Sequence, residues 1–207
     1  SAADIRMLTQ SRLATNISNG IVHAFKEYDA SEIIMGLHNK KNETDKFWGL
    51  FTPNLVNSLN RQIIMCRCNC PLNTLRRIVV AVPSRVEFEE GFYRWVERLS
   101  RLAENLGCRI IFHGRIETTS LINEYIRNNH QGVRAEYVLM EHWKEFIDLS
   151  QEISNDHLLV VITARVGTVS YKPIFERLPI ELYRHFHEKN LMIIYPDQNG
   201  QSPEDMT

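Results

Sequence analysis

Short apolar stretches alternate with longer amphipathic stretches along most of the chain. The short ones, such as 78–82, 158–163 and 191–195, have the length and the aliphatic content of buried strands. The longer ones repeat apolar residues every three or four positions, which predicts helices packed against a sheet. Strands are expected at 4–9, 31–37, 62–68, 75–82, 108–113, 134–140, 157–163 and 191–195, and helices at 15–28, 47–60 (beginning near Thr52), 87–106, 117–129, 142–153 and 173–187.

This alternation predicts an α/β fold built on a parallel sheet. From residue 75 onward the pattern is a complete set of five strands with four helices between them, whereas the first part matches only the back half of such a set. Segments 31–68 and 156–196 also share one order: apolar strand, polar loop, helix, short apolar strand. We therefore expect two tandem modules, an incomplete one at 1–74 and a complete one at 75–207, with a polar, frayed tail from residue 196.

The loop that follows the first strand of each repeated segment carries the same spacing of positions. These positions are Gly36, Asn39, Gly49 and Leu50 in the first copy and Ala164, Gly167, Arg177 and Leu178 in the second. The spacing resembles the phosphate-binding loop of the universal stress protein family, in which glycines let backbone N–H groups approach phosphate oxygens. The resemblance implies tandem parallel-sheet modules of the universal-stress-protein-like (adenine nucleotide alpha hydrolase-like) type, the first of them incomplete.

The same resemblance implies a loop that binds ATP or AMP. Its ligand-binding residues would be Gly36, His38, Asn39, Gly49 and Thr52 in the first module and Gly167, Thr168 and Ser170 in the second. Both loops depart from the family's pattern, because Leu50 lacks a hydroxyl group and Arg177 replaces a glycine. Pro83 stands where the family has an aspartate, and proline offers neither a carboxylate nor an N–H. We therefore expect weakened phosphate binding in the second module, with Arg165 and Lys172 flanking the loop as cations.

Eroded tandem modules that begin in mid-module are similar to the cytoplasmic C-terminal tails of bacterial cation/proton antiporters. This similarity implies a regulatory or assembly domain at the cytoplasmic face of the inner membrane, with its own transmembrane transport domain as partner and a homodimer as a further candidate assembly. Universal stress proteins commonly pair through their last strands, so 63–65 and 191–195 are expected to pair within this chain. Two alternatives stay open: a free-standing nucleotide-binding universal stress protein and a nucleotide-dependent enzyme.

Composition and charge further limit the classes of function that fit the sequence. The chain has 207 residues and a formal net charge of −1, so no overall field favours nucleic acid as a partner. No run approaches the roughly 18–20 apolar residues of a membrane span. The opening residues lead almost directly into a strand-like pattern, which predicts a fragment of a longer chain. No recognisable catalytic motif is present, and Cys66, Cys68 and Cys70 lack the spacing of a metal site. We expect neither catalysis nor a bound metal.

Overall fold

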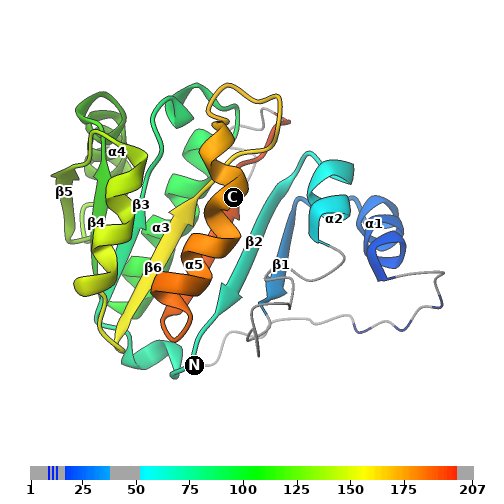
Figure 1. The fold of residues 1–207 in the computed structure, drawn as a ribbon, viewed down its shortest axis with the longest axis horizontal. Helices are drawn as coiled ribbons and strands as arrows, with labels where there is room; N and C mark the ends of the chain where they lie inside the picture. The colour runs from blue at the N-terminus through cyan, green and yellow to red at the C-terminus, as the bar shows by residue number, and fades with distance from the viewer. Residues whose placement is uncertain (1–8, 10, 12, 14–16, 38–51, 200–207) are drawn as a thin grey trace.

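The computed structural model describes residues 9, 11, 13, 17–37 and 52–199, in which one twisted sheet carries helices on both faces (Figure 1). The expected loop at 38–46 and, apart from Thr9, the expected strand at 4–9 lie outside the described residues. The strands are β1 (Glu32–Gly36), β2 (Gln62–Arg67), β3 (Arg77–Ala81), β4 (Arg109–Gly114), β5 (Ala135–Leu139), β6 (His157–Ile162) and β7 (Asn190–Tyr195). The α-helices are α1 (Ile17–Glu27), α2 (Thr52–Ser58), α3 (Phe92–Leu106), α4 (Ile116–Asn129) and α5 (Leu178–Phe186), and the 3-10 segments are η1 (Leu72–Thr74), η2 (Val86–Phe88), η3 (Trp143–Gln151) and η4 (Pro173–Arg177).

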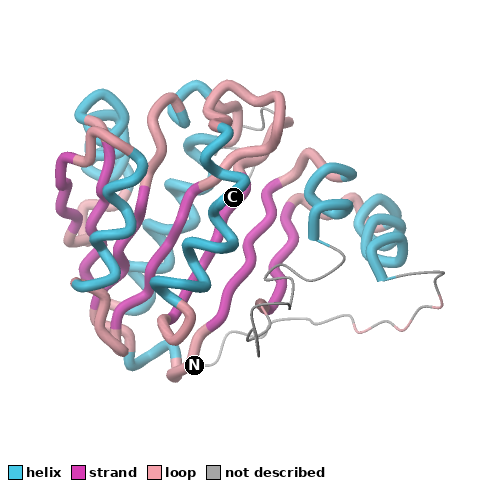
Figure 2. Tube along the Cα trace, in the orientation of Figure 1, coloured by secondary structure: helices cyan, strands magenta, loops and turns pink. Residues whose placement is uncertain are grey.

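The seven strands lie in the order β1-β2-β7-β6-β3-β4-β5, as the trace in Figure 2 also shows. From β3 onward every neighbouring pair is parallel, which confirms the expected α/β class. The chain starts this part in the middle at β3, runs outward through β4 to β5, and then crosses back to β6 on the other side of β3. Such a reversal creates a switch point at the carboxyl ends of β3 and β6, which is where open parallel sheets bind ligands.

Strands β2 and β7 join the two predicted modules by antiparallel pairing. The register places Ile63 opposite Tyr195 and Met65 opposite Ile193, so the predicted pairing of 63–65 with 191–195 is confirmed. Segments β1–α2–β2 and β6–η4–α5–β7 have the same element order, and each contains a parallel strand pair. Helices α2 and α5 pack into the same core cluster, so both segments place their helix on the same face of the sheet.

Two apolar cores lie on opposite faces of the sheet. One gathers side chains beneath α2, η3 and α5, and the other gathers side chains beneath α3 and α4. Strand β6 contributes to both, because Leu158 and Leu159 point to opposite faces and both are fully buried. A central strand buried on both faces explains why 157–163 reads as a continuous apolar run rather than as an alternating one.

Two of the expected helices are wholly or partly 3-10 in form. The segment expected at 142–153 is η3, which opens with a capping box between His142 and Glu145. The helix expected at 173–187 is divided into η4 and α5. Pro179 explains the division, because it has no N–H to bond to the carbonyl of Phe175, and the N–H of Leu178 bonds to that carbonyl instead.

The segment after β7 is packed rather than frayed, so the expectation of a loose tail is wrong for residues 196–199. Asp197 is 1% exposed and forms an ion pair of 2.7 Å with Arg94, which is 3% exposed. Arg94 is therefore not on the outer face of its helix, where the helical pattern predicts it. Gly91 allows this packing, because a Cβ atom at that position would lie 2.5 Å from the backbone of Asp197.

Two buried arginines hold the modules together. Arg165, which follows β6, donates from Nε to the carbonyls of Val56 and Leu59 at 3.1 Å, at the C-terminal end of α2. Arg67, at the end of β2, donates to the carbonyls of Phe186 at 3.0 Å and Lys189 at 3.3 Å, at the C-terminal end of α5. Each arginine thus caps a helix of the other module, where a cation is also favoured by the helix dipole.

Candidate functional site

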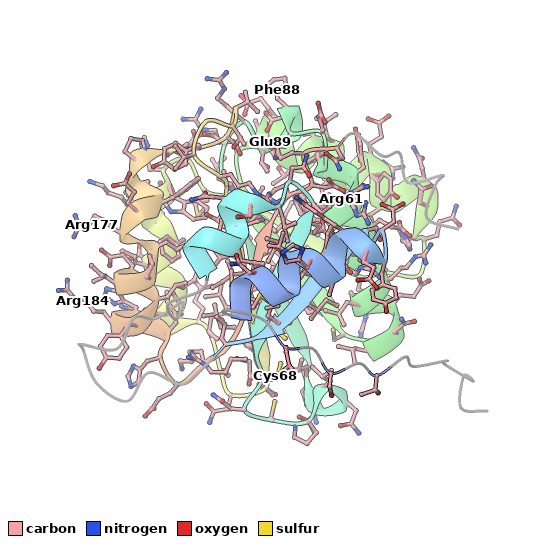
Figure 3. The ribbon with its side chains drawn as sticks, turned by 90° about the vertical axis from the view of Figure 1, so that its right-hand side faces the viewer. Arg61, Cys68, Phe88, Glu89, Arg177 and Arg184 are labelled. Carbon is pink, nitrogen blue, oxygen red and sulfur yellow. The ribbon has the colours of Figure 1, made fainter. Side chains whose placement is uncertain are left out.

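The switch point is built from the segments that follow β3, β4 and β6. After β3 the chain turns through Pro83, Ser84 and Arg85 into η2, and after β6 it forms a loop over 163–172. Arg85 has a φ of 69°, which is uncommon for a residue with a side chain. Figure 3 shows Glu89 at one end of the molecule and Cys68 at the opposite end, so the cysteine run lies far from this site.

Glu89 holds the loop that follows β6. Its Oε1 accepts hydrogen bonds from the backbone N–H of Ser170 at 2.9 Å and from the hydroxyl of the same residue at 2.5 Å. Its Oε2 accepts a hydrogen bond from the side-chain amide of Gln198 at 2.9 Å. Burial alone would raise the pKa of Glu89, but hydrogen bonds from Ser170, Gln198 and Thr168 lower it below its ordinary value. The carboxylate is therefore charged, and it occupies both hydrogen-bond donors of Ser170.

Three cationic side chains gather at the end of the same loop. Lys172 donates from Nζ to the hydroxyl of Ser84 at 2.5 Å. Burial lowers the pKa of Lys172, and the positive charges of Arg115 and Arg85 lower it further, so both arginines lie within electrostatic reach of Lys172. One carboxylate faces them at the edge: Glu141 lies 3.8 Å from Arg115. We call Arg85, Arg115 and Lys172 the cationic group.

The cationic group has two chemical uses. Three cations with one carboxylate at their edge, at the carboxyl ends of parallel strands, are suited to an anion such as a phosphate. A lysine of lowered pKa against a serine hydroxyl is also the kind of pair that activates a nucleophile in acyl transfer. The positive charges of Arg85 and Arg115 near Lys172 favour the first use, because an anion would neutralise them.

The structure separates the predicted ligand-binding residues into two groups. Strand β1 runs parallel to β2 and therefore antiparallel to β6, so Gly36 ends its strand at the opposite end of the sheet from Gly167. His38, Asn39 and Gly49 lie outside the described residues, as does the side chain of Thr52, whose backbone begins α2. Among the described residues, Gly36 therefore lies apart from the predicted residues of the second loop.

In the second loop the predicted residues do lie together. Gly167 is exposed at a φ of 88°, and the hydroxyl of Thr168 donates to the carbonyl of Arg165 at 2.9 Å. Both donors of Ser170 are engaged by Glu89, so its binding of a ligand stays a prediction that requires displacement of this carboxylate. Arg165 does not flank the loop as a free cation, because Nε, Nη1 and Nη2 all donate to backbone carbonyls. The sequence pattern indicated Lys172 but missed Glu89 and Arg85.

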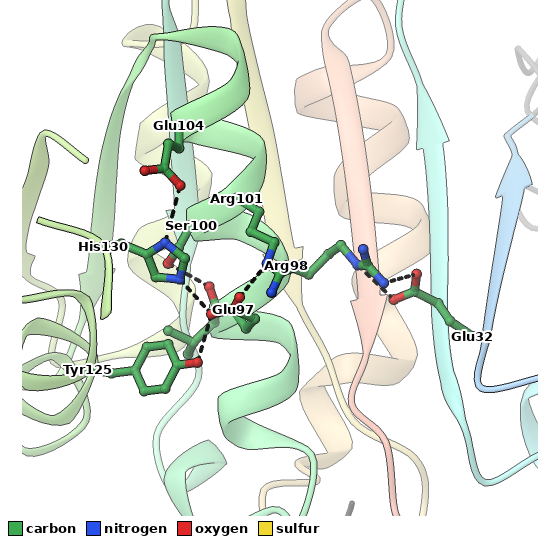
Figure 4. Close-up of polar contacts among 9 residues, drawn as sticks. Glu32, Glu97, Arg98, Ser100, Arg101, Glu104, Tyr125 and His130 are labelled. Carbon is green, nitrogen blue, oxygen red and sulfur yellow. Dashed lines mark hydrogen bonds and ion pairs between the residues drawn. The ribbon is translucent and has the colours of Figure 1, made fainter. Parts of the chain in front are cut away.

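A second polar cluster joins α3 to α4 and is drawn in Figure 4. Glu97 accepts a hydrogen bond from the hydroxyl of Tyr125 at 2.7 Å and contacts His130 at 2.5 Å and Arg101 at 2.5 Å. Burial alone would raise the pKa of Glu97, but these hydrogen bonds lower it. Glu97 and His130 are almost fully enclosed, so this cluster fastens two helices rather than serving a ligand. The helical pattern did not reveal it, because Arg94, Ser100 and Arg101 lie one turn from Glu97 and together read as a polar, solvated face.

Two observations on the described part of the chain concern metal ligands and membrane spans. Among its residues no three His, Cys, Asp or Glu side chains are placed to hold a metal ion. None of its helices has the length and hydropathy of a membrane span. Cys66 and Cys68 are half-buried, and burial raises the pKa of both thiols, so they are poor nucleophiles.

No family model and no curated protein matches this sequence. Among solved structures, a universal stress protein from Archaeoglobus fulgidus is similar, with a TM-score of 0.58 and 14% identity over 87% of this chain. The match spans 65% of that protein. A protein of unknown function from Pseudomonas aeruginosa gives a TM-score of 0.49 and 13% identity over 89% of this chain and 69% of its own. Identity at this level carries the architecture and nothing finer. The chain therefore has the mixed α/β, universal-stress-protein-like fold, built on a mostly parallel sheet of seven strands.

Proposed function

We propose that the chain is a regulatory and assembly domain, without catalysis of its own, that senses a small phosphorylated ligand and serves a cation/proton antiporter. One observation carries the ligand part: the loop after β6 is held by Glu89, while the cationic group lies beside it. A ligand that competes with an internal carboxylate binds weakly and shifts a conformational balance, which suits a sensor better than an enzyme.

The joint between the modules supports the assembly role. Antiparallel pairing of β2 with β7 and the reciprocal caps of Arg165 and Arg67 make the two modules one body. Movement of the loop after β6 would pull on Arg165 and so on the end of α2. Ligand binding at the switch point would in this way reach the first module. The antiporter host rests on the sequence resemblance, with the cytoplasmic face of the inner membrane as the proposed location.

A measurement of ion exchange tests whether this chain is part of a cation/proton antiporter. The complete reading frame that encodes this chain would be expressed in a bacterial strain without its own sodium/proton exchangers, and proton movement measured in inverted vesicles across a range of phosphate concentrations. We expect Lys172→Met to change the phosphate dependence of exchange. The matched control is Arg184→Met, which removes one exposed charge on α5, away from Glu89 (Figure 3). A reading frame without a transport domain, or equal responses of the two variants, would contradict the proposal.

A free-standing nucleotide-binding protein is the second candidate, favoured by the position of the cationic group at the switch point. Calorimetric titration with ATP and AMP separates the two. Binding in the micromolar range that is lost in Lys172→Met favours the free-standing protein, whereas binding in the millimolar range or weaker favours the sensor. The enzyme alternative predicts that an activated ester or fluorophosphonate labels Ser84, and such labelling would contradict a domain without catalysis.

A further inference from the structure

A pocket lies at the joint between the modules, and the segment after β6 lines part of it. Its volume is ≈ 330 Å³, within the range of roughly 300–1,000 Å³ that is typical of small-ligand pockets. Both modules line it: α2 contributes Val56 and Asn57, and the remaining lining comes from the second module. This pocket is separate from the cationic group, none of whose members lines it.

The walls of this pocket are aromatic. The rings of Tyr171 and Phe175 stand almost perpendicular, with centroids 6.2 Å apart and an interplanar angle of 83°. Tyr195 forms a further side, and the guanidinium group of Arg165 lies 5.7 Å from the centroid of its ring. Burial raises the pKa of Tyr195 to about 12, so its ring is a neutral phenol at neutral pH. In this edge-to-face pair one ring turns its edge toward the other, and a ring face that borders the pocket is electron-rich and attracts a cation.

The charged residues around the pocket indicate whether it suits an anion or a cation. Glu176 lines the pocket with a carboxylate that accepts a hydrogen bond from the hydroxyl of Tyr171 at 2.9 Å. Arg165 also lines the pocket, but its N–H donors are directed to the carbonyls of Pro196, Arg61 and the end of α2. The negative charges of Asp197 and Glu89 lie within electrostatic reach of Arg165. An anion would find no free donor from this arginine, whereas a cation would meet Glu176 and aromatic faces.

We infer that this pocket binds a small organic cation of the methylated ammonium class. The cationic head would lie against Tyr171 and Phe175 with Glu176 as its counter-charge, and its apolar methyl groups would replace water against Val56 and Pro179. Because α2 and the loop after β6 both contact the site, an occupant would bridge the two modules at the joint that Arg165 already spans. The inference does not depend on the antiporter host or on anion binding.

Choline and its neutral isostere dimethylbutanol, in which carbon replaces the nitrogen, test the sign of the charge. Both would be titrated into the whole chain and followed by the ring signals of tyrosine in NMR spectra. We expect choline to bind with a dissociation constant of about 1–10 mM, and the isostere at least about tenfold more weakly, because cation–π attraction and the carboxylate act on the charge alone. Equal binding of the two compounds, or no binding of choline at ~50 mM, would overturn the inference.

Single substitutions test whether choline binds in this pocket. Tyr171→Leu and Glu176→Gln should each weaken choline binding by about three- to tenfold, while Glu188→Gln, at an exposed carboxylate after α5, should leave it unchanged. Thermal melts of all three variants establish that they are folded. Lys172→Met separates this site from the switch point: it should weaken phosphate binding and leave choline binding as it is. Choline binding that is lost in Lys172→Met but kept in Tyr171→Leu would place the cation elsewhere and contradict the assignment.

Discussion

Replacing Glu89 with glutamine should increase the affinity of the switch point for phosphate. The carboxylate occupies both donors of Ser170 and places a negative charge on the loop that ends at Lys172. The glutamine oxygen can still accept from Ser170, so the loop keeps its path, and the loss of stability should be about 1–2 kcal/mol. The variant therefore removes the competing charge with little change of shape.

The size of the gain follows from the repulsion that the variant removes. A phosphate held by the loop would lie about 5 Å from the Glu89 carboxylate, where two unit charges repel by roughly 1.7–3.3 kcal/mol at an effective dielectric constant of about 20–40. That energy corresponds to a gain of roughly 15- to 200-fold in affinity. Isothermal titration calorimetry with inorganic phosphate and with AMP, at low ionic strength, measures it directly.

The matched control is Glu90→Gln, which removes the same charge from the adjacent, exposed position. It should change phosphate affinity by less than about twofold, because a solvated charge at greater distance is screened by salt. Equal affinities in Glu89→Gln and Glu90→Gln would refute the view that Glu89 competes with ligand. Phosphate binding that persists unchanged in a Lys172→Met background would refute the role of the cationic group.

Three further predictions concern stability. Arg94→Met should lower the free energy of unfolding in urea by about 3–5 kcal/mol, because it leaves the buried carboxylate of Asp197 unpaired; a loss below ~1 kcal/mol would contradict a buried pair. Gly91→Ala should cost about 1–3 kcal/mol in the same assay, since its Cβ would overlap the backbone at Asp197, and an unchanged midpoint would count against that contact. Glu97 has a lowered pKa, so its stabilisation is complete above its ordinary value of 4.5 and is lost as pH falls through the lower folded value. The stability difference between the wild type and Glu97→Gln should therefore be constant above about pH 5 and shrink in acid, and a difference independent of pH would contradict this.

Much of the fold was predictable from the apolar pattern. Strands such as β3 and β6 are buried on both faces, so their continuous apolar runs mark them clearly. The resemblance to universal stress proteins indicated that 63–65 and 191–195 would pair, but not that β2 and β7 would be antiparallel. The local form of η3 and η4 was not predictable in the same way, because i, i+3 and i, i+4 bonding share nearly the same apolar period and differ through single residues such as Pro179.

The site was only partly predictable, because its decisive residue belongs to a distant segment. Glu89 and Ser170 are separated by 81 positions in the chain, and no spacing rule joins a carboxylate of that kind to a loop. Arg94 was also not predictable from local sequence. An arginine on an amphipathic helix is expected to be exposed, and only its ion pair with the distant Asp197 explains its burial. Whether the predicted residues of the first loop bind a ligand stays a prediction.

The most direct test is an NMR pH titration of the Ser170 amide proton. If this N–H donates to the Glu89 carboxylate, its chemical shift should follow the titration of that carboxyl group, with a midpoint below the ordinary value of 4.5. The same proton should not titrate in Glu89→Gln. A Ser170 amide whose shift is independent of pH in the wild type, or whose midpoint lies above 4.5, would contradict a loop closed on its own carboxylate.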